Sequence, residues 1–347
     1  MEETGNQKLK IGNLEARVPV IQGGMGVGVS LSGLAGAVAA AGGVGIISTA
    51  QIGFREPEFS TSPIACNLAA IGKEVEKARR IAKGGILGVN IMVATRGYED
   101  YVRAAVAAGV DLIISGAGLP VDLPGWVAGS EVKLAPIVSS VKALQVITRY
   151  WMKKYNRKPD LIVIEGPKAG GHLGFSREEL AQLTPELYDQ EIAAIIARSR
   201  ELELPVVVAG GIYHREDLEH YQQMGAAGVQ LATRFVTTPE CDASQAFKQA
   251  YLDARKEDIV IVSSPVGMPG RAIRNRFISR VEQGERFSFP CKQCIVTCKP
   301  ATTPYCITQA LINAVEGRLD EGLIFCGENA WRSDHMETVD EIMKEFA

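Results

Sequence analysis

The sequence predicts an α/β protein, a (β/α)8 TIM barrel with a C-terminal helical and cysteine-rich extension. Short apolar, β-branched runs alternate with longer amphipathic stretches, which is typical of repeated βα units and a parallel sheet. There are eight such runs, the count that closes a barrel, whereas an open doubly wound sheet more often stops at about five or six. The length of 347 residues is ordinary for a barrel that carries a tail.

The predicted strands are almost continuous apolar runs, as expected for strands that are buried on both faces. They lie at 18–24, 44–49, 86–93, 111–116, 133–138, 161–166, 205–211 and 228–235. Amphipathic helices are expected between them, for example at 31–43, 97–110, 140–155 and 215–226. Glu99 and Asp100 support the second of these helices, because acidic side chains in a first turn favour the helix N-terminus.

The repeating pattern breaks after about residue 256, where Gly, Pro and Cys punctuate the chain. We therefore expect residues 1–255 to form the cofactor-binding barrel. Residues 256–347 should form an extension that packs on the barrel, with helices near 304–317 and 335–346.

Composition excludes several classes of protein. The net charge of −3 is spread over interspersed acids and bases, so no basic stripe is present to bind nucleic acid. The longest apolar runs fall short of the ~20 residues that a membrane helix needs. The first residues, MEETGNQKLK, are polar and contain no apolar signal-peptide core. A cytoplasmic enzyme without a membrane partner is expected.

In a barrel the active site is built from the residues that follow each strand, so the strand ends are the informative positions. The first strand ends in Gly23-Gly24-Met25, where glycines let the backbone approach a flat ring, although an ordinary glycine turn would have the same sequence. The third strand contains Asn90, an amide within an apolar run that must find hydrogen bonds. Those bonds can be structural or can go to the edge of a flavin.

The sixth strand is the most informative. It runs from Glu165 into a glycine-rich loop, and the loop presents His172 between glycines with nothing evident to pack on. Imidazole titrates near neutrality, which suits a general base, so His172 is the predicted catalytic residue. The other histidines, His214, His220 and His335, lie in polar, helix-like surroundings and are expected at the surface.

The ends of the seventh and eighth strands predict a phosphate site. Gly210-Gly211 ends one strand and Gln230-Leu231-Ala232-Thr233 ends the other, and the loops after these two strands are the usual phosphate site of the fold. No GxGxxG motif and no Walker loop is present, so a Rossmann-type dinucleotide site is not expected. A mononucleotide such as FMN fits better.

Four cysteines, Cys291, Cys294, Cys298 and Cys306, are spaced C-x2-C-x3-C-x7-C. The spacing is compatible with four thiolates on one metal or on an iron–sulfur cluster, but it matches no standard pattern closely. Free cysteines also serve as small core residues. A structural or substrate-lining role is favoured, and no metal ligand is predicted.

Six motifs occur in a characteristic order over residues 10–275: IQGGMGVG, AGGVGIIS, GVNIMV, EGPKAGGHLG, VVVAGGI and GVQLATRF. In this order they resemble the nitronate monooxygenase (2-nitropropane dioxygenase) family and its relative, the FabK-type FMN-dependent enoyl-ACP reductase. The resemblance implies FMN as the cofactor and His172 as the base that deprotonates a nitroalkane. The residues implied to bind FMN are Gly24, Met25, Asn90, Glu165, Gly170, Gly171, Gly211, Gln230, Leu231, Ala232 and Thr233.

Two positions depart from the pattern of the nitronate oxidases. Ala232 stands where the family usually has Gly, and Leu173 stands where many members have Arg.

The leading hypothesis is oxidation of alkyl nitronates by oxygen to a carbonyl compound and nitrite. Leu173 favours the alternative, reduction of an enoyl thioester with NAD(P)H. A third hypothesis is a non-catalytic flavin- or metal-binding sensor. The residues do not decide the oligomeric state, and a homodimer is compatible with them.

Overall fold

The computed structural model describes residues 8–347. The first seven residues of the polar N-terminal segment discussed above lie outside the described residues. In the described part of the chain, no helix is both long and apolar enough to cross a bilayer.

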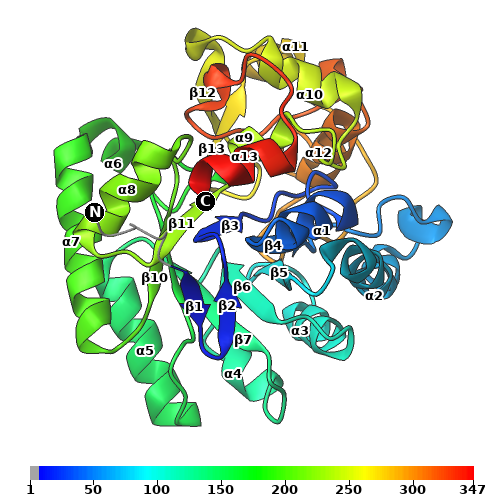
Figure 1. Cartoon of the computed structure of the whole chain (residues 1–347). Helices are drawn as coiled ribbons and strands as arrows, with labels where there is room; N and C mark the ends of the chain where they lie inside the picture. Colours follow the sequence, from blue (N-terminus) through cyan, green and yellow to red (C-terminus); the bar gives the residue numbers. More distant parts are fainter. Residues whose placement is uncertain (1–7) are drawn as a thin grey trace.

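Eight parallel strands form one closed barrel at the centre of the molecule (Figure 1). This confirms the predicted fold class and the presence of all eight predicted strands. The eighth is shorter than predicted, because it ends at Leu231 and Thr233–Val236 form a short helix instead. Each strand pairs with the next along the chain, and the last pairs with the first. The strands are β3 (Val20–Gln22), β4 (Val44–Ser48), β5 (Ile86–Met92), β6 (Leu112–Gly116), β7 (Lys133–Val138), β8 (Ile162–Glu165), β10 (Val206–Ala209) and β11 (Gly228–Leu231).

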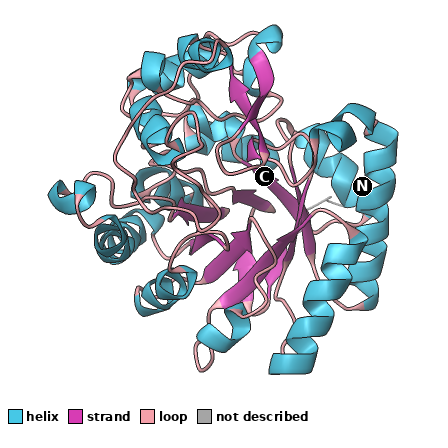
Figure 2. Ribbon diagram, turned by 180° about the vertical axis from the view of Figure 1, so that it is seen from behind, coloured by secondary structure: helices cyan, strands magenta, loops and turns pink. Residues whose placement is uncertain are grey.

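Helices surround the barrel, as Figure 2 shows from behind. The four helices expected from the sequence are α1 (Ser32–Ala40), α3 (Tyr98–Ala107), α5 (Val141–Tyr155) and α8 (Arg215–Met224). Two long helices complete the ring, α2 (Pro63–Ala82) and α7 (Pro185–Glu201), and each has Pro in its first turn. Shorter helices are α4 (Leu123–Trp126), α6 (Arg177–Gln182), α9 (Thr233–Val236) and α10 (Gln245–Leu252).

A hairpin at the start of the described chain extends the core within the barrel. Its strands are β1 (Leu9–Ile11) and β2 (Leu14–Ala16). Leu9 and Ile11 are fully buried and belong to the same apolar cluster as Val163 and Val207, which come from the barrel strands β8 and β10. Gly12 in the hairpin turn lies against Lys133 at the start of β7 and Asp160 just before β8, so the hairpin covers the amino ends of these strands. The carboxyl ends are therefore left for a site.

The C-terminal extension contains strands β12 (Ile259–Ser263) and β13 (Pro269–Ile273) and helices α11 (Arg276–Glu282), α12 (Ile307–Val315) and α13 (Val339–Phe346). The two helices expected in this region correspond to α12 and α13. Helix α13 packs against α1, so the end of the chain returns to the barrel (Figure 1). Strand β13 pairs with the two-residue strand β9 (Gly171–His172), which joins the extension to the loop after β8.

Candidate active site

A cavity of about 470 Å³ lies at the carboxyl ends of the barrel strands. Its wall includes every residue that the sequence predicted for the site. They are Gly24, Met25, Asn90, Glu165, Gly170, Gly171, His172, Gly211, Gln230, Leu231, Ala232 and Thr233. Five barrel strands, β3, β5, β8, β10 and β11, and the loops after them thus bring together residues that are far apart in the sequence.

Two glycines in this wall are required by the backbone. A side chain at Gly24 would place its Cβ 2.5 Å from Asn90 Cβ, so the loop after β3 approaches β5 only without one. Gly211 has a φ of +84°, a left-handed conformation that L-residues with side chains rarely adopt. Both glycines line the cavity, and a side chain at either position would collide with a neighbouring residue, Asn90 or Lys168.

His172 is in the cavity wall but differs from the expectation in one respect. It was expected to have nothing to pack on, whereas its ring lies edge-to-face against Phe325 with centroids 5.0 Å apart, and its Nε2 is 2.7 Å from Ser264 Oγ. Desolvation at this position lowers the pKa of His172 to about 4. The imidazole is therefore neutral at pH 7, the form that accepts a proton.

Glu165 ends β8 and faces the same cavity. In the described part of the chain its carboxyl group has neither a hydrogen bond nor an ion pair, and burial raises the pKa of Glu165 to about 7. A buried carboxyl group without a partner is costly, and a molecule bound in the cavity would supply the missing hydrogen bond.

Gln230 gives the clearest sign of a missing partner. Its Oε1 atom is buried and accepts no hydrogen bond from the described residues. A buried acceptor without a donor is costly, about 1–3 kcal/mol. Because Gln230 lines the cavity, a ligand with hydroxyl or N–H donors would remove this cost.

Ala232 in the loop after β11 has a φ of −135°, so this position does not need the left-handed conformation that would favour glycine. Thr233 Oγ1 accepts a hydrogen bond from the Gly327 backbone N–H at 3.1 Å. Lys168, which was not predicted as a site residue, also lines the cavity and lies against Gly211. This end of the cavity therefore combines backbone, a hydroxyl group and a cation.

The extension supplies one side of the wall, mostly through residues that the sequence analysis did not single out. Met268, Phe325, Cys326 and Gly327 line the cavity, and Asn329 Nδ2 donates to Gly211 O at 2.6 Å. The loop after β8 is held from outside as well, because the buried Arg271 of β13 donates to Pro167 O at 2.7 Å and to Ala169 O. No periodicity in the sequence marks these residues.

From the sequence, Leu173 is expected to favour an enoyl thioester substrate, but its side chain does not face the cavity. Its side chain is 1% exposed and is not part of the cavity wall, and its backbone N–H pairs with Pro269 O at 2.9 Å. In the strand β9, His172 faces the cavity and the next side chain faces the core, as the alternation of a strand requires. The side chain of Leu173 therefore does not line the cavity in which a substrate would bind.

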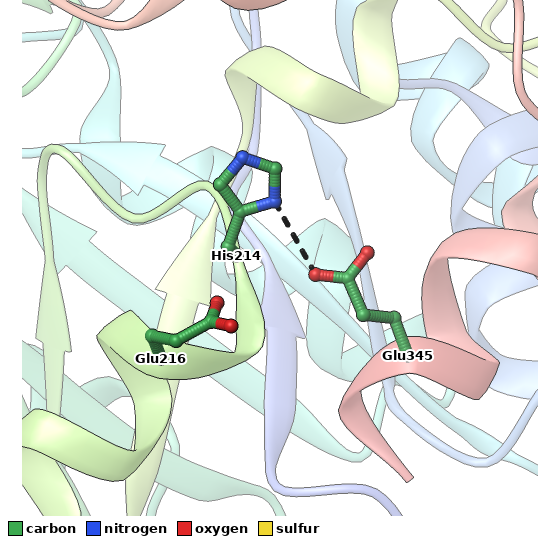
Figure 3. Close-up of side chains that lie close together, drawn as sticks. All are labelled: His214, Glu216 and Glu345. Atoms are coloured by element: carbon green, nitrogen blue, oxygen red, sulfur yellow. Dashed lines mark ion pairs between the residues drawn. The ribbon is translucent and has the colours of Figure 1, made fainter.

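The remaining histidines are at the surface, as predicted, and one of them belongs to a carboxylate cluster. His214, Glu216 and Glu345 have ligand atoms within 4.8 Å of one another (Figure 3). Glu345 is already engaged, because it pairs with Arg234 at 2.6 Å and with His214 at 3.4 Å. The cluster fastens α13 to α8 and lies apart from the cavity residues.

The position of the cavity places the chain among the (β/α)8-barrel enzymes, which carry out their chemistry at the carboxyl ends of the strands. Comparison with known families makes the assignment specific. The family model described as nitronate monooxygenase matches residues 7–347, and the chain belongs to this family. It is a flavin-dependent oxidoreductase, as predicted, and the non-catalytic hypothesis is thereby removed.

Among curated proteins, a probable nitronate monooxygenase of Staphylococcus saprophyticus is 27% identical over 294 residues, 78% of this chain and 80% of that protein. A Mycobacterium tuberculosis protein is 26% identical over 268 residues, 77% of this chain and 66% of its own; it is named (3aS,4S,5R,7aS)-5-hydroxy-7a-methyl-1-oxo-octahydro-1H-indene-4-carboxyl-CoA dehydrogenase.

Among solved structures, FabK from Thermotoga maritima has a TM-score of 0.73 at 25% identity, and the match covers 95% of this chain and 92% of FabK. Nitroalkane oxidase from Streptomyces ansochromogenes has a TM-score of 0.72 at 18% identity, with 95% of each chain covered, and so supports the fold alone.

Proposed function

We propose that the chain binds FMN and oxidises alkyl nitronates or nitroalkanes with oxygen to a carbonyl compound and nitrite. The observation that carries the proposal is the neutral imidazole of His172, which faces the cavity predicted to hold the flavin. Membership of the nitronate monooxygenase family supports the reaction class.

The wall fits a flavin mononucleotide in three respects. Gln230 Oε1 is a buried acceptor that needs a donor, and a ribityl hydroxyl group supplies one. Asn90 lines the cavity next to Gly24, where backbone and amide suit the edge of a flat ring. Gly211, Lys168 and Thr233 would hold the phosphate with backbone groups, a cation and a hydroxyl group.

Bound flavin would supply the redox chemistry, and the residues of this chain supply orientation and proton transfer. His172 would accept the α-proton of a neutral nitroalkane, a step that a placed base accelerates by ~10²–10⁴-fold. Ser264, 2.7 Å from Nε2, and the ring of Phe325 fix the orientation of the imidazole. Phe325 and Met268 would make the surroundings of the imidazole partly apolar.

Reduction of an enoyl thioester by NAD(P)H is the second candidate. It is favoured by the likeness to FabK and by the relative named as a CoA-ester dehydrogenase. Leu173 no longer supports it, because that side chain lies outside the cavity wall.

Anaerobic mixing separates the two functions. The purified protein is mixed in the absence of oxygen with a preformed alkyl nitronate or with NADH and NADPH, and the flavin absorbance is followed. Rapid bleaching by the nitronate but not by the pyridine nucleotides is expected. Bleaching by NADH or NADPH alone would contradict the proposal and support the enoyl reductase.

A further inference from the structure

A second cavity, of about 340 Å³, adjoins the active-site cavity inside the extension. All four cysteines of the C-x2-C-x3-C-x7-C segment line it: Cys291, Cys294, Cys298 and Cys306. Cys294 and Ile295 line both cavities and so form part of the wall between them. Cysteines distributed over sixteen residues of sequence are thus collected around one space, next to the proposed flavin.

The charge around this second cavity is entirely positive. Arg96, Arg286 and Lys292 line it, and no Asp or Glu does. None of the three forms an ion pair with a carboxylate among the described residues, although Lys292 is only 6% exposed and its Nζ lies 5.7 Å from the centre of the Phe59 ring. A nearly buried cation without a carboxylate partner indicates that an anion belongs in the cavity.

The segment that carries the cysteines is fastened to the barrel. Cys294 O accepts the backbone N–H of Arg96 at 3.0 Å, and Ile295 forms a bridge with Thr95 in the loop after β5. Gln293 adopts a left-handed φ of +52° and donates its backbone N–H to Cys291 Sγ at 3.4 Å. A backbone N–H directed at a cysteine sulfur stabilises a thiolate ligand.

We propose that the four cysteines bind a [4Fe–4S] cluster in this cavity. Four thiolates on such a cluster form an anionic unit, which the three cations compensate and which carboxylates would oppose. This differs from the sequence-based expectation, which favoured a structural or substrate-lining role. What the sequence did not show is that one cavity collects all four thiols and that its charged wall contains only cations.

A single zinc ion fits the arrangement less well. Tetrahedral zinc with Zn–S bonds of ~2.3 Å requires sulfur atoms ~3.8 Å apart. Among the described residues, no three of these cysteine sulfurs lie within 4.8 Å of one another. A cubane cluster holds its cysteine sulfurs farther apart, because the iron–sulfide core stands between them.

The test is the iron and acid-labile sulfide content of the full-length chain, purified without oxygen and then reconstituted with ferrous iron and sulfide. We expect about four iron and about four sulfide atoms per chain, with an electron paramagnetic resonance signal after reduction by dithionite. Zinc instead of iron, or no bound iron after reconstitution, would overturn the proposal. Neither result depends on nitronate turnover, so the proposed function is tested separately.

A matched pair of variants localises the cluster. Cys298→Ser removes one proposed ligand and should lose most of the iron, whereas Cys66→Ser changes a buried cysteine of α2 outside the cavity and should keep it. Retention of flavin by both variants verifies that the barrel is folded. Unchanged iron content in a folded Cys298→Ser variant would show that the iron is not bound by these thiols.

Discussion

The pKa values of two side chains in the active-site cavity, His172 and Glu165, are shifted in opposite directions by the same cause. Desolvation disfavours the charged form of each, so it lowers the pKa of His172 to about 4 and raises the pKa of Glu165 to about 7. At neutral pH the imidazole is uncharged and the carboxyl group is partly protonated. Together these two side chains therefore carry at most a partial negative charge before ligands bind.

The variant His172→Asn should retain flavin but lose most turnover of neutral nitroalkanes. We expect a loss of about 10²-fold, near the lower end of what a placed base contributes, because an imidazole of low pKa is a weak base. Turnover of preformed nitronate should fall much less. In the native protein, nitroalkane turnover should decline as the pH falls through about 4 and not through 6.5.

The measurement is steady-state kinetics with both substrate forms. The control is His220→Asn, a surface histidine of α8, which should leave both rates unchanged. If His172→Asn processed the neutral nitroalkane at the native rate, His172 would not be the base.

The variant Glu165→Gln should stabilise flavin-free protein at alkaline pH. The pKa of Glu165 is raised in the folded state, so folding takes up a proton between the unfolded value of 4.5 and about 7, and stability is lost as the pH rises through this window. Gln carries no such penalty. We expect a gain of ~1–3 kcal/mol above pH 7 that disappears near pH 4.5.

Thermal melts at several pH values measure this difference. The exposed Glu178, changed to Gln in a matched control, should show no pH-dependent gain. A gain of equal size at pH 4.5 and pH 8 in Glu165→Gln would contradict the assigned cause.

Which residues line the cavity was predictable from the sequence, but their partners were not. Strand ends and glycines mark positions such as Asn90 and Gly211 in the sequence, because the fold brings strand ends together. The contact of His172 with Ser264 joins residues 92 positions apart, and nothing local indicates it. The pKa of His172 was misjudged for the same reason, because burial is a property of the tertiary structure.

At the scale of elements, β13 controls the loop that carries the imidazole. Its Arg271, 7% exposed, donates to two carbonyl groups of that loop, Pro167 O and Ala169 O, and its backbone pairs with β9. These bonds hold the glycine-rich loop against the barrel, in a position that glycines alone would leave poorly defined.

The variant Arg271→Met should weaken flavin binding. Met keeps much of the buried volume but leaves both carbonyl groups without their donor, at ~1–3 kcal/mol each. We expect the dissociation constant for FMN, measured by quenching of flavin fluorescence, to rise tenfold or more. Arg274→Met, which removes an exposed ion pair with Glu282, is the control and should leave it unchanged. Equal affinities in both variants would refute this role of β13.

The sequence predicts the barrel strands well but gives no sign of the short strand β9. The barrel strands are continuous apolar runs, so their pattern identifies them without tertiary information. Strand β9 has only two residues, Gly171 and His172, and exists because β13 pairs with it. Such a strand has no local signal.

At the scale of the whole molecule, the extension completes the wall of the active-site cavity at the carboxyl ends of the barrel strands. It supplies Phe325 and Met268 to the active-site cavity and contains a second cavity lined by cysteines. The two cavities share Cys294, which places the proposed cluster beside the proposed flavin. Packing of the extension on the barrel was expected, but its contribution to the site follows only from the structure.

The central claim is that the barrel cavity binds FMN. The most direct measurement is the absorption spectrum of the purified protein, followed by chromatography of the cofactor released on denaturation. A yellow protein that releases about one FMN per chain is expected, since the loops after β10 and β11, where this fold usually binds phosphate, line the cavity. Release of FAD, or a chain that binds no flavin even after incubation with FMN, would contradict the account.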